Sequence, residues 1–176
     1  MTVRLYPGVN IAAMSTPGRY RIRLAKQDFK FSVAHFTVFA ADDAELLHGH
    51  NYRVSVEIEG RETRGGLLAD VAAVKRRIRE LCEGLDSRTL LPTGNPLVAV
   101  EEREGSVEVR YAERVYVLPA ADCRLLPLAN ASMEEFARHL WEHLAPTLEG
   151  SGLDVLQVTV EETDGQSCSF ERRLDE

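Results

Sequence analysis

Two histidines separated by a single glycine, His48 and His50 in the segment ELLHGHNYRV, have the arrangement of metal ligands. Side chains at positions i and i+2 of a strand point the same way, so both imidazoles would lie on one face. His35 ends a preceding alternating run on its apolar face. Three imidazole nitrogens at about 2.0–2.1 Å bind zinc and leave a fourth position open. The pattern predicts a catalytic Zn²⁺ site at these three histidines.

The sequence leaves two alternatives to this zinc site. The three histidines could be ordinary core or rim residues. A second pattern, His139-Leu-Trp-Glu-His143, matches the H-x-x-E-H of an inverted zinc-protease helix. On a helical wheel, however, the apolar stripe centres near Leu140 and Leu144, and His139 and His143 lie away from it. We interpret this second pair as part of a solvated face.

Glu162 stands out in the apolar alternation of residues 153–163. It has the same parity as the apolar residues Leu156, Val158 and Val160, whereas Glu161 takes the other face. A carboxylate on an apolar face is costly unless it is paired. The position therefore indicates a binding role, with an exposed strand end as the alternative.

The alternation of apolar residues predicts the strands that carry these side chains. They cover residues 19–25, 28–36, 51–59, 153–163 and 168–172, and a hairpin is expected from 106–111 and 114–118. Residues 92–105 look irregular.

Spacings of three and four predict two helices. The first opens at Asp70, with Gly84 as its stop, and the second starts near Ser132, where Glu135 completes a capping-box spacing. This order of elements predicts an α+β fold, an antiparallel sheet with both helices on one face.

Composition narrows the classes of function. The 176 residues predict one domain over 1–176. A formal charge of −7, from 21 basic and 28 acidic residues, argues against a nucleic-acid partner. No run approaches the roughly 18 apolar residues of a membrane span, and the N-terminal apolar stretch is too short for a signal peptide. Three widely spaced cysteines, Cys82, Cys123 and Cys168, fit a reducing cytoplasm.

Several segments, in this order, resemble the 6-pyruvoyltetrahydropterin synthase and 6-carboxytetrahydropterin synthase family: FKFSVAHF, LLHGHNYRVSVEIEG, GGLLADVAAVKRRI, LDSRTLL, SMEEFARHLWEHL and VEETDGQSC. The resemblance runs from about residue 20 to 173. It implies a tunnelling fold with a four-stranded antiparallel sheet and two helices per subunit. It also implies a homo-oligomer, a trimer that closes a barrel or a hexamer of two trimers, with active sites between subunits. Residues 96–128 resemble an insert found in part of the family.

The resemblance also implies roles for single residues. Zinc would bind at His35, His48 and His50, and the Glu162 carboxylate would anchor the guanidine-like edge of a pterin. Asp86 and Thr163 would support the site. The family's usual catalytic cysteine, four residues before the first of the paired histidines, is Ala44 here.

The second departure concerns an Asp-His pair that the family brings from a neighbouring subunit, which here reads Asp86-Ser87. A subgroup with a glutamate near the lost cysteine is associated with folate biosynthesis. Its members cleave the side chain of 7,8-dihydroneopterin triphosphate to 6-hydroxymethyl-7,8-dihydropterin. This implies a zinc-dependent lyase, with Glu45 as the candidate base. Burial would raise the pKa of Glu45 towards neutrality, which suits that role.

Other interpretations stay open at this point. The acidic segment around Glu45 could be a solvated loop, and Asp42 and Asp43 are alternative bases. The chain could have 6-pyruvoyltetrahydropterin synthase or 6-carboxytetrahydropterin synthase activity. It could also be a non-catalytic homologue that binds zinc and a pterin.

Overall fold

The structure is a computed structural model that describes residues 18–61, 63 and 66–175. Within these residues, two α-helices and ten strands follow one another in the order β1(Tyr20–Leu24), β2(Lys30–His35), β3(His48–Gly60), α1(Val71–Leu85), β4(Arg88–Pro92), β5(Ala99–Arg103), β6(Ser106–Tyr111), β7(Arg114–Pro119), β8(Cys123–Leu126), α2(Met133–Leu144), β9(Val155–Thr163) and β10(Gln166–Arg173).

The main sheet is built around the long strand β3. One edge of β3 pairs antiparallel with β9, which pairs with β10. Its other edge is shared, because β2 pairs with the first half and β1 with the second half. These five strands form four rows, because β1 and β2 share one row, and in this sense the antiparallel sheet has the predicted four-stranded layout. Two short parallel strands, β4 and β8, extend it beyond β2.

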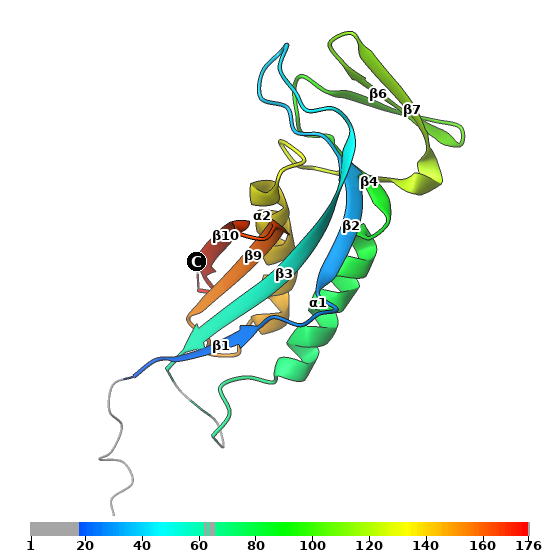
Figure 1. Ribbon diagram of the computed structural model, residues 1–176. Coiled ribbons are helices and arrows are strands. Elements are labelled where there is room, and N and C mark those ends of the chain that lie inside the picture. Colours follow the sequence, from blue (N-terminus) through cyan, green and yellow to red (C-terminus); the bar gives the residue numbers. More distant parts are fainter. Residues whose placement is uncertain (1–17, 62, 64–65, 176) are drawn as a thin grey trace, which may run out of the picture.

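Both helices cover the same face of this sheet, as Figure 1 shows. Alternate residues of the strands meet the apolar stripes of the helices there, and their side chains form the main core. Its members include Tyr52, Val54, Val56, Ile58, Leu156, Val158, Val160, Val74, Ile78, Phe136 and Leu140. The predicted α+β class is confirmed. The even-numbered positions of β3, which include His48 and His50, therefore face the helices.

The segment between β4 and β8 is more regular than the sequence indicated. The predicted hairpin is present as β6 and β7, but β5 pairs with β6 to make a separate three-stranded antiparallel sheet. The prediction that residues 92–105 are irregular was wrong for Ala99–Arg103. Most residues of β5 are charged, and Val100 alone in this strand is partly buried. The apolar alternation of β5 is therefore too short to detect in the sequence.

The ends of both helices differ from the sequence predictions. Helix α1 continues through Gly84 to Leu85, because Leu85 is buried with Ile78 and Cys82 on the core face. That burial outweighs the roughly 1 kcal/mol that glycine costs in a helix. Ser132 is the N-cap residue of α2, but its side chain makes no capping hydrogen bond. The predicted capping box is absent because Glu135 instead accepts from the backbone N–H of Ala129, at 3.0 Å.

Within the residues that the structure describes, neither helix is long and apolar enough to cross a bilayer.

Candidate metal centre and adjoining groove

Three histidines converge where β2 ends and β3 begins. The antiparallel register places His35 opposite His48, and His50 follows two residues later on the same face. The ring centroids lie 4.7 Å apart for His35 and His48, and 4.6 Å apart for His48 and His50. One ligand atom from each ring lies within 4.8 Å of the other two. Among the described residues, no other group of three or more possible ligands is this close.

Hydrogen bonds prepare two of these rings to bind a metal. The Nδ1 atoms of His35 and His48 lie 2.8 Å and 2.7 Å from the carbonyl oxygens of Ala131 and Leu46. A carbonyl can only accept, so each Nδ1 carries the hydrogen and each Nε2 keeps its lone pair. Metal-binding histidines usually donate their second N–H in this way. The donor set therefore fits a zinc ion.

Burial keeps His35 in the neutral form that a metal requires. The side chain is only 2% exposed. Burial is the main cause that lowers its pKa; His48 and His50 lower it further, and the hydrogen bond to Ala131 opposes them. A neutral imidazole can bind a cation without first releasing a proton.

Glu162 lies beside the histidines. One of its carboxylate oxygens is 3.1 Å from Nε2 of His50, and its side chain is 17% exposed. The Tyr52 hydroxyl lies 3.4 Å from the other oxygen and 2.9 Å from Nε2 of His35. Burial first, and then the charge of Glu162, raise the Tyr52 pKa above its ordinary value. Tyr52 was not singled out from the sequence, although it shares a strand face with His48 and His50.

Glu45 lies in the loop that joins β2 to β3. This loop folds back on itself through a bridge between Val38 and Ala44. The Glu45 N–H donates to the Thr37 carbonyl, and the Thr37 N–H donates to the Glu45 carboxylate, both at 2.9 Å. Asp42 and Asp43 are exposed at the tip of the loop.

The pKa of Glu45 is lower than its ordinary value, and the expected upward shift was wrong. Burial alone would raise this pKa. The hydrogen bonds from Thr37 and the adjacent His48 and His35 favour the charged form and outweigh burial. Glu45 is therefore a carboxylate at neutral pH, able to accept a proton.

Asp86 and Thr163 lie at the edges of this region. The Asp86 carboxylate accepts hydrogen bonds from the Ser32 N–H at 2.7 Å and from the Ser87 hydroxyl at 3.0 Å. Thr163 is exposed at the end of β9, and its hydroxyl is 3.5 Å from Gln166. Within the described part of the chain, neither residue has a hydrogen bond or ion pair to the three histidines or to Glu45. Their supporting role remains a prediction.

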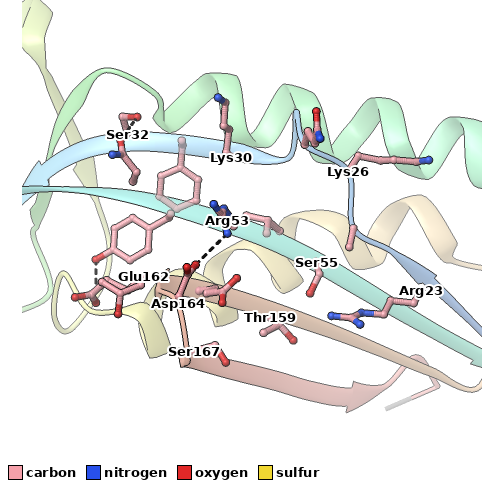
Figure 2. Close-up of a pocket in the computed structure, with 18 residues that line it drawn as sticks. Arg23, Lys26, Lys30, Ser32, Arg53, Ser55, Thr159, Glu162, Asp164 and Ser167 are labelled. Atoms are coloured by element: carbon pink, nitrogen blue, oxygen red, sulfur yellow. Dashed lines mark hydrogen bonds and ion pairs between the residues drawn. The ribbon is translucent and has the colours of Figure 1, made fainter.

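A polar groove begins at Glu162 and Tyr52 and runs along the strands, with a volume of about 950 Å³. Figure 2 shows the side chains along it, with Lys26, Lys30 and Arg53 among its basic residues and Glu162 at one end. A carboxylate there can accept hydrogen bonds from a planar polar ligand.

The other histidine pair lies on α2 and lacks a third ligand among the described residues. The ring centroids of His139 and His143 are 4.2 Å apart, and Nδ1 of His143 lies 2.8 Å from the carbonyl oxygen of His139. His139 is partly buried, so its assignment to a solvated face was wrong. Burial first, and then His143, lower the pKa of His139 to about 4.

This shift predicts a stability that depends on pH. The His139 pKa of about 4 in the folded state lies below the ordinary histidine value of about 6.5. Stability from neutral His139 is therefore present above pH 6.5 and is lost as the pH falls towards 4. The free energy of unfolding of the wild-type protein should fall between neutral and acid pH. We expect His139→Gln to make this fall smaller by about 1–2 kcal/mol, a value discounted because the side chain is partly exposed.

Urea unfolding at pH 7.5 and pH 4.5, with chelator present, checks this difference. The chelator removes any contribution from metal release at acid pH. Identical losses in wild type and variant would contradict the prediction.

Comparisons with known proteins place these observations in context. The family described as 6-pyruvoyl tetrahydropterin synthase matches residues 24–173. A curated protein of Methanocaldococcus jannaschii, provisionally named 6-carboxy-5,6,7,8-tetrahydropterin synthase, is 28% identical over 152 residues. That match covers 83% of this chain and 91% of the relative.

Solved structures give the same fold. The 6-pyruvoyl tetrahydropterin synthase of Plasmodium vivax superimposes with a TM-score of 0.83 at 26% identity, covering 89% of this chain and 99% of that one. Two variants of that protein match with a TM-score of 0.81, at the same identity and coverage. Both are described as catalytic-residue mutants, in which a glutamate is replaced by alanine or by cysteine. The predicted tunnelling fold is confirmed.

Proposed function

The chain belongs to the 6-pyruvoyl tetrahydropterin synthase family, and on that basis we propose that it is a zinc-dependent lyase acting on 7,8-dihydroneopterin triphosphate or a close relative. The proposed product is 6-hydroxymethyl-7,8-dihydropterin, a folate precursor. One observation carries this choice of reaction. The carboxylate of Glu45 is held by Thr37, two residues after His35, and lies near enough to His48 and His35 for their charges to lower its pKa. Glu45 follows Ala44, where the family's usual cysteine would stand. A glutamate described as the catalytic residue of the Plasmodium vivax protein supports this assignment.

In this mechanism Glu45 is the general base. Its lowered pKa leaves it charged at neutral pH, so it can take the proton of the substrate's 2′-hydroxyl. The C2′ oxygen then forms a carbonyl while the C1′–C2′ bond breaks as a retro-aldol, and the bonding electrons pass to C1′. A proton delivered to C1′ completes the hydroxymethyl group, and a two-carbon aldehyde leaves with the triphosphate. Zinc held by the three histidines would lower the pKa of the side-chain hydroxyls.

Glu162 is the proposed anchor of the pterin ring. Its carboxylate lies at the junction of the histidines and the groove, where it can accept two N–H groups from one planar edge. We expect Glu162→Gln to weaken pterin binding about 100-fold, because the amide presents an N–H where the ligand also donates. A titration of 7,8-dihydroneopterin followed by fluorescence measures this effect.

Glu161→Gln is the matched control, because Glu161 has the opposite parity on the same strand. Its affinity should stay near that of wild type. An equal loss of affinity in both variants would argue against Glu162 as the anchor. Zinc content, measured in parallel, separates an effect on the pterin from an effect through His50.

The remaining parts of the proposal follow from the resemblance. We propose a single pterin-synthase-like domain over residues 1–176, with 96–128 as an insert. We also propose a cytoplasmic homo-oligomer, a trimer or hexamer whose active sites lie between subunits, so that Asp86 and Thr163 support a site completed by a neighbouring copy. The three free cysteines fit a reducing compartment.

Product identity tests the reaction. The zinc-loaded protein is incubated with 7,8-dihydroneopterin triphosphate, and the oxidised pterins are separated by fluorescence chromatography. A 6-hydroxymethyl product that disappears after zinc is removed would support the lyase. A 6-pyruvoyl or 6-carboxy product would favour the family's other activities. Bound zinc and pterin without turnover would favour a non-catalytic binding protein.

A further inference from the structure

The loop that carries Glu45 packs against the separate three-stranded sheet of β5, β6 and β7. Figure 1 shows the segment after β2 beside this sheet, away from the helices. We call residues 36–47 the Glu45 loop and residues 99–119 the inserted sheet. We propose that the inserted sheet positions the Glu45 carboxylate and that Arg114 is the positioning residue. This inference rests on the proposed function, in which Glu45 is the base.

Arg114 holds the main chain of the loop at Glu45 itself. Its guanidinium donates to the carbonyl oxygen of Glu45 at 2.6 Å and to that of Ala44 at 3.3 Å. The Glu45 N–H and carboxylate are already bound to Thr37. The carbonyl, the N–H and the carboxylate of this residue therefore each have a partner, and Arg114 is the one that comes from outside the loop.

A second polar contact lies next to the first. The Tyr111 hydroxyl donates to the carbonyl of Ala40 at 2.6 Å, on the other arm of the loop. The Arg114 guanidinium lies over the Tyr111 ring, 5.7 Å from its centroid. This packing limits the conformations of both side chains.

Apolar packing joins the same two segments. Phe36 follows the metal-ligand candidate His35 directly, and its ring centroid lies 5.8 Å from that of Tyr116 and 6.3 Å from that of Tyr111. Phe36 and Val38 are buried in one cluster with residues of the inserted sheet, including Val107, Val109 and Tyr111. This cluster is separate from the core under the helices. The loop thus depends on the inserted sheet for its burial.

The chemistry of Arg114 suits a positioning role. Among the described residues, no carboxylate forms an ion pair with it, and its charged donors are directed to two main-chain carbonyls. The strongest influences on the Glu45 pKa are burial, Thr37, His48 and His35. Arg114 therefore acts on where the carboxylate lies. A displacement of about 1 Å in a reacting group can reduce a rate about 100-fold.

The test compares Arg114→Ala with Arg110→Ala. Arg110 lies on the same inserted sheet but pairs with Glu108 within it, so its loss should leave the loop unchanged. We expect Arg114→Ala to increase amide hydrogen exchange in residues 36–47 and to lower kcat about 10- to 100-fold. KM and zinc content should stay near their wild-type values. Arg114→Lys, which keeps the charge but has one nitrogen to donate, should recover part of both effects.

A double-mutant cycle decides whether Arg114 acts through Glu45. In the Glu45→Gln background, the further change Arg114→Ala should not lower kcat again. An equal loss in both backgrounds would overturn the inference, as would unchanged exchange and kcat in Arg114→Ala. If Arg114→Ala does not fold, the same comparisons are made with Arg114→Lys.

The exchange measurement separates this inference from the proposed reaction. If the wild-type protein turns over no pterin, the proposed function fails. Amide hydrogen exchange in Arg114→Ala then tests the positioning role of Arg114 by itself. A rise confined to residues 36–47 would then support the positioning role, and no rise would overturn it.

Discussion

Replacing His48 by alanine should weaken zinc binding by at least about 100-fold, and His50→Ala should do the same. Loss of a ligand costs more than the 10- to 100-fold that follows loss of a residue that only orients one. Both side chains are partly exposed, so the fold should survive their truncation. The measurement is the zinc content of each variant and of the wild type after dialysis, determined by elemental mass spectrometry.

His139→Ala is the matched control for this experiment. It removes a histidine from the H-x-x-E-H segment of α2, where the described residues offer no third ligand. This variant should keep its full zinc content. Zinc lost from His139→Ala and kept by His48→Ala would contradict the assignment and restore the protease interpretation.

Replacing Glu45 by glutamine should lower kcat about 10²- to 10⁴-fold, which is the usual contribution of a general base. Glutamine keeps an oxygen that can accept the Thr37 N–H, so the loop should keep its shape while the base is lost. Zinc content and pterin affinity should therefore stay close to their wild-type values. Single-turnover rates with 7,8-dihydroneopterin triphosphate isolate the chemical step.

Asp43→Asn is the control for Glu45, because Asp43 is an exposed acidic residue two positions earlier in the same loop. Its kcat should not change. If Glu45→Gln retained full activity, another group would have to be the base. If Asp43→Asn lost activity as well, the effect would belong to the loop and not to one carboxylate.

Local periodicity was enough to predict the fold class and the candidate metal centre. Alternation along β2 and β3 indicated that His35, His48 and His50 share the apolar face, and the register between these strands confirms it. The same argument gave Glu162 the parity of the buried residues Leu156, Val158 and Val160, and its contact with Tyr52 agrees with this. These predictions succeed because the direction of a strand side chain depends only on parity, which can be read without knowledge of the partner.

Other features depended on neighbours that are distant in sequence. Strand β5 has little apolar alternation of its own and is fixed by pairing with β6. The pKa of Glu45 shifts downwards because Thr37 and two histidines outweigh burial. Helix α1 continues beyond Gly84 because the side chain of Leu85 is buried in the core.

The contact between Arg114 and Glu45 shows most clearly which features cannot be predicted from the sequence. The two residues are 69 positions apart, and nothing in the sequence around either one predicts the other. Hydrogen bonds and desolvation depend on distances of a few ångströms between groups that only the folded chain brings together. The three histidines, Glu162 and the strand faces that carry them were therefore readable from the sequence, whereas the contacts of Tyr52 were not. How those groups are held, and which are charged, was decided by the tertiary structure.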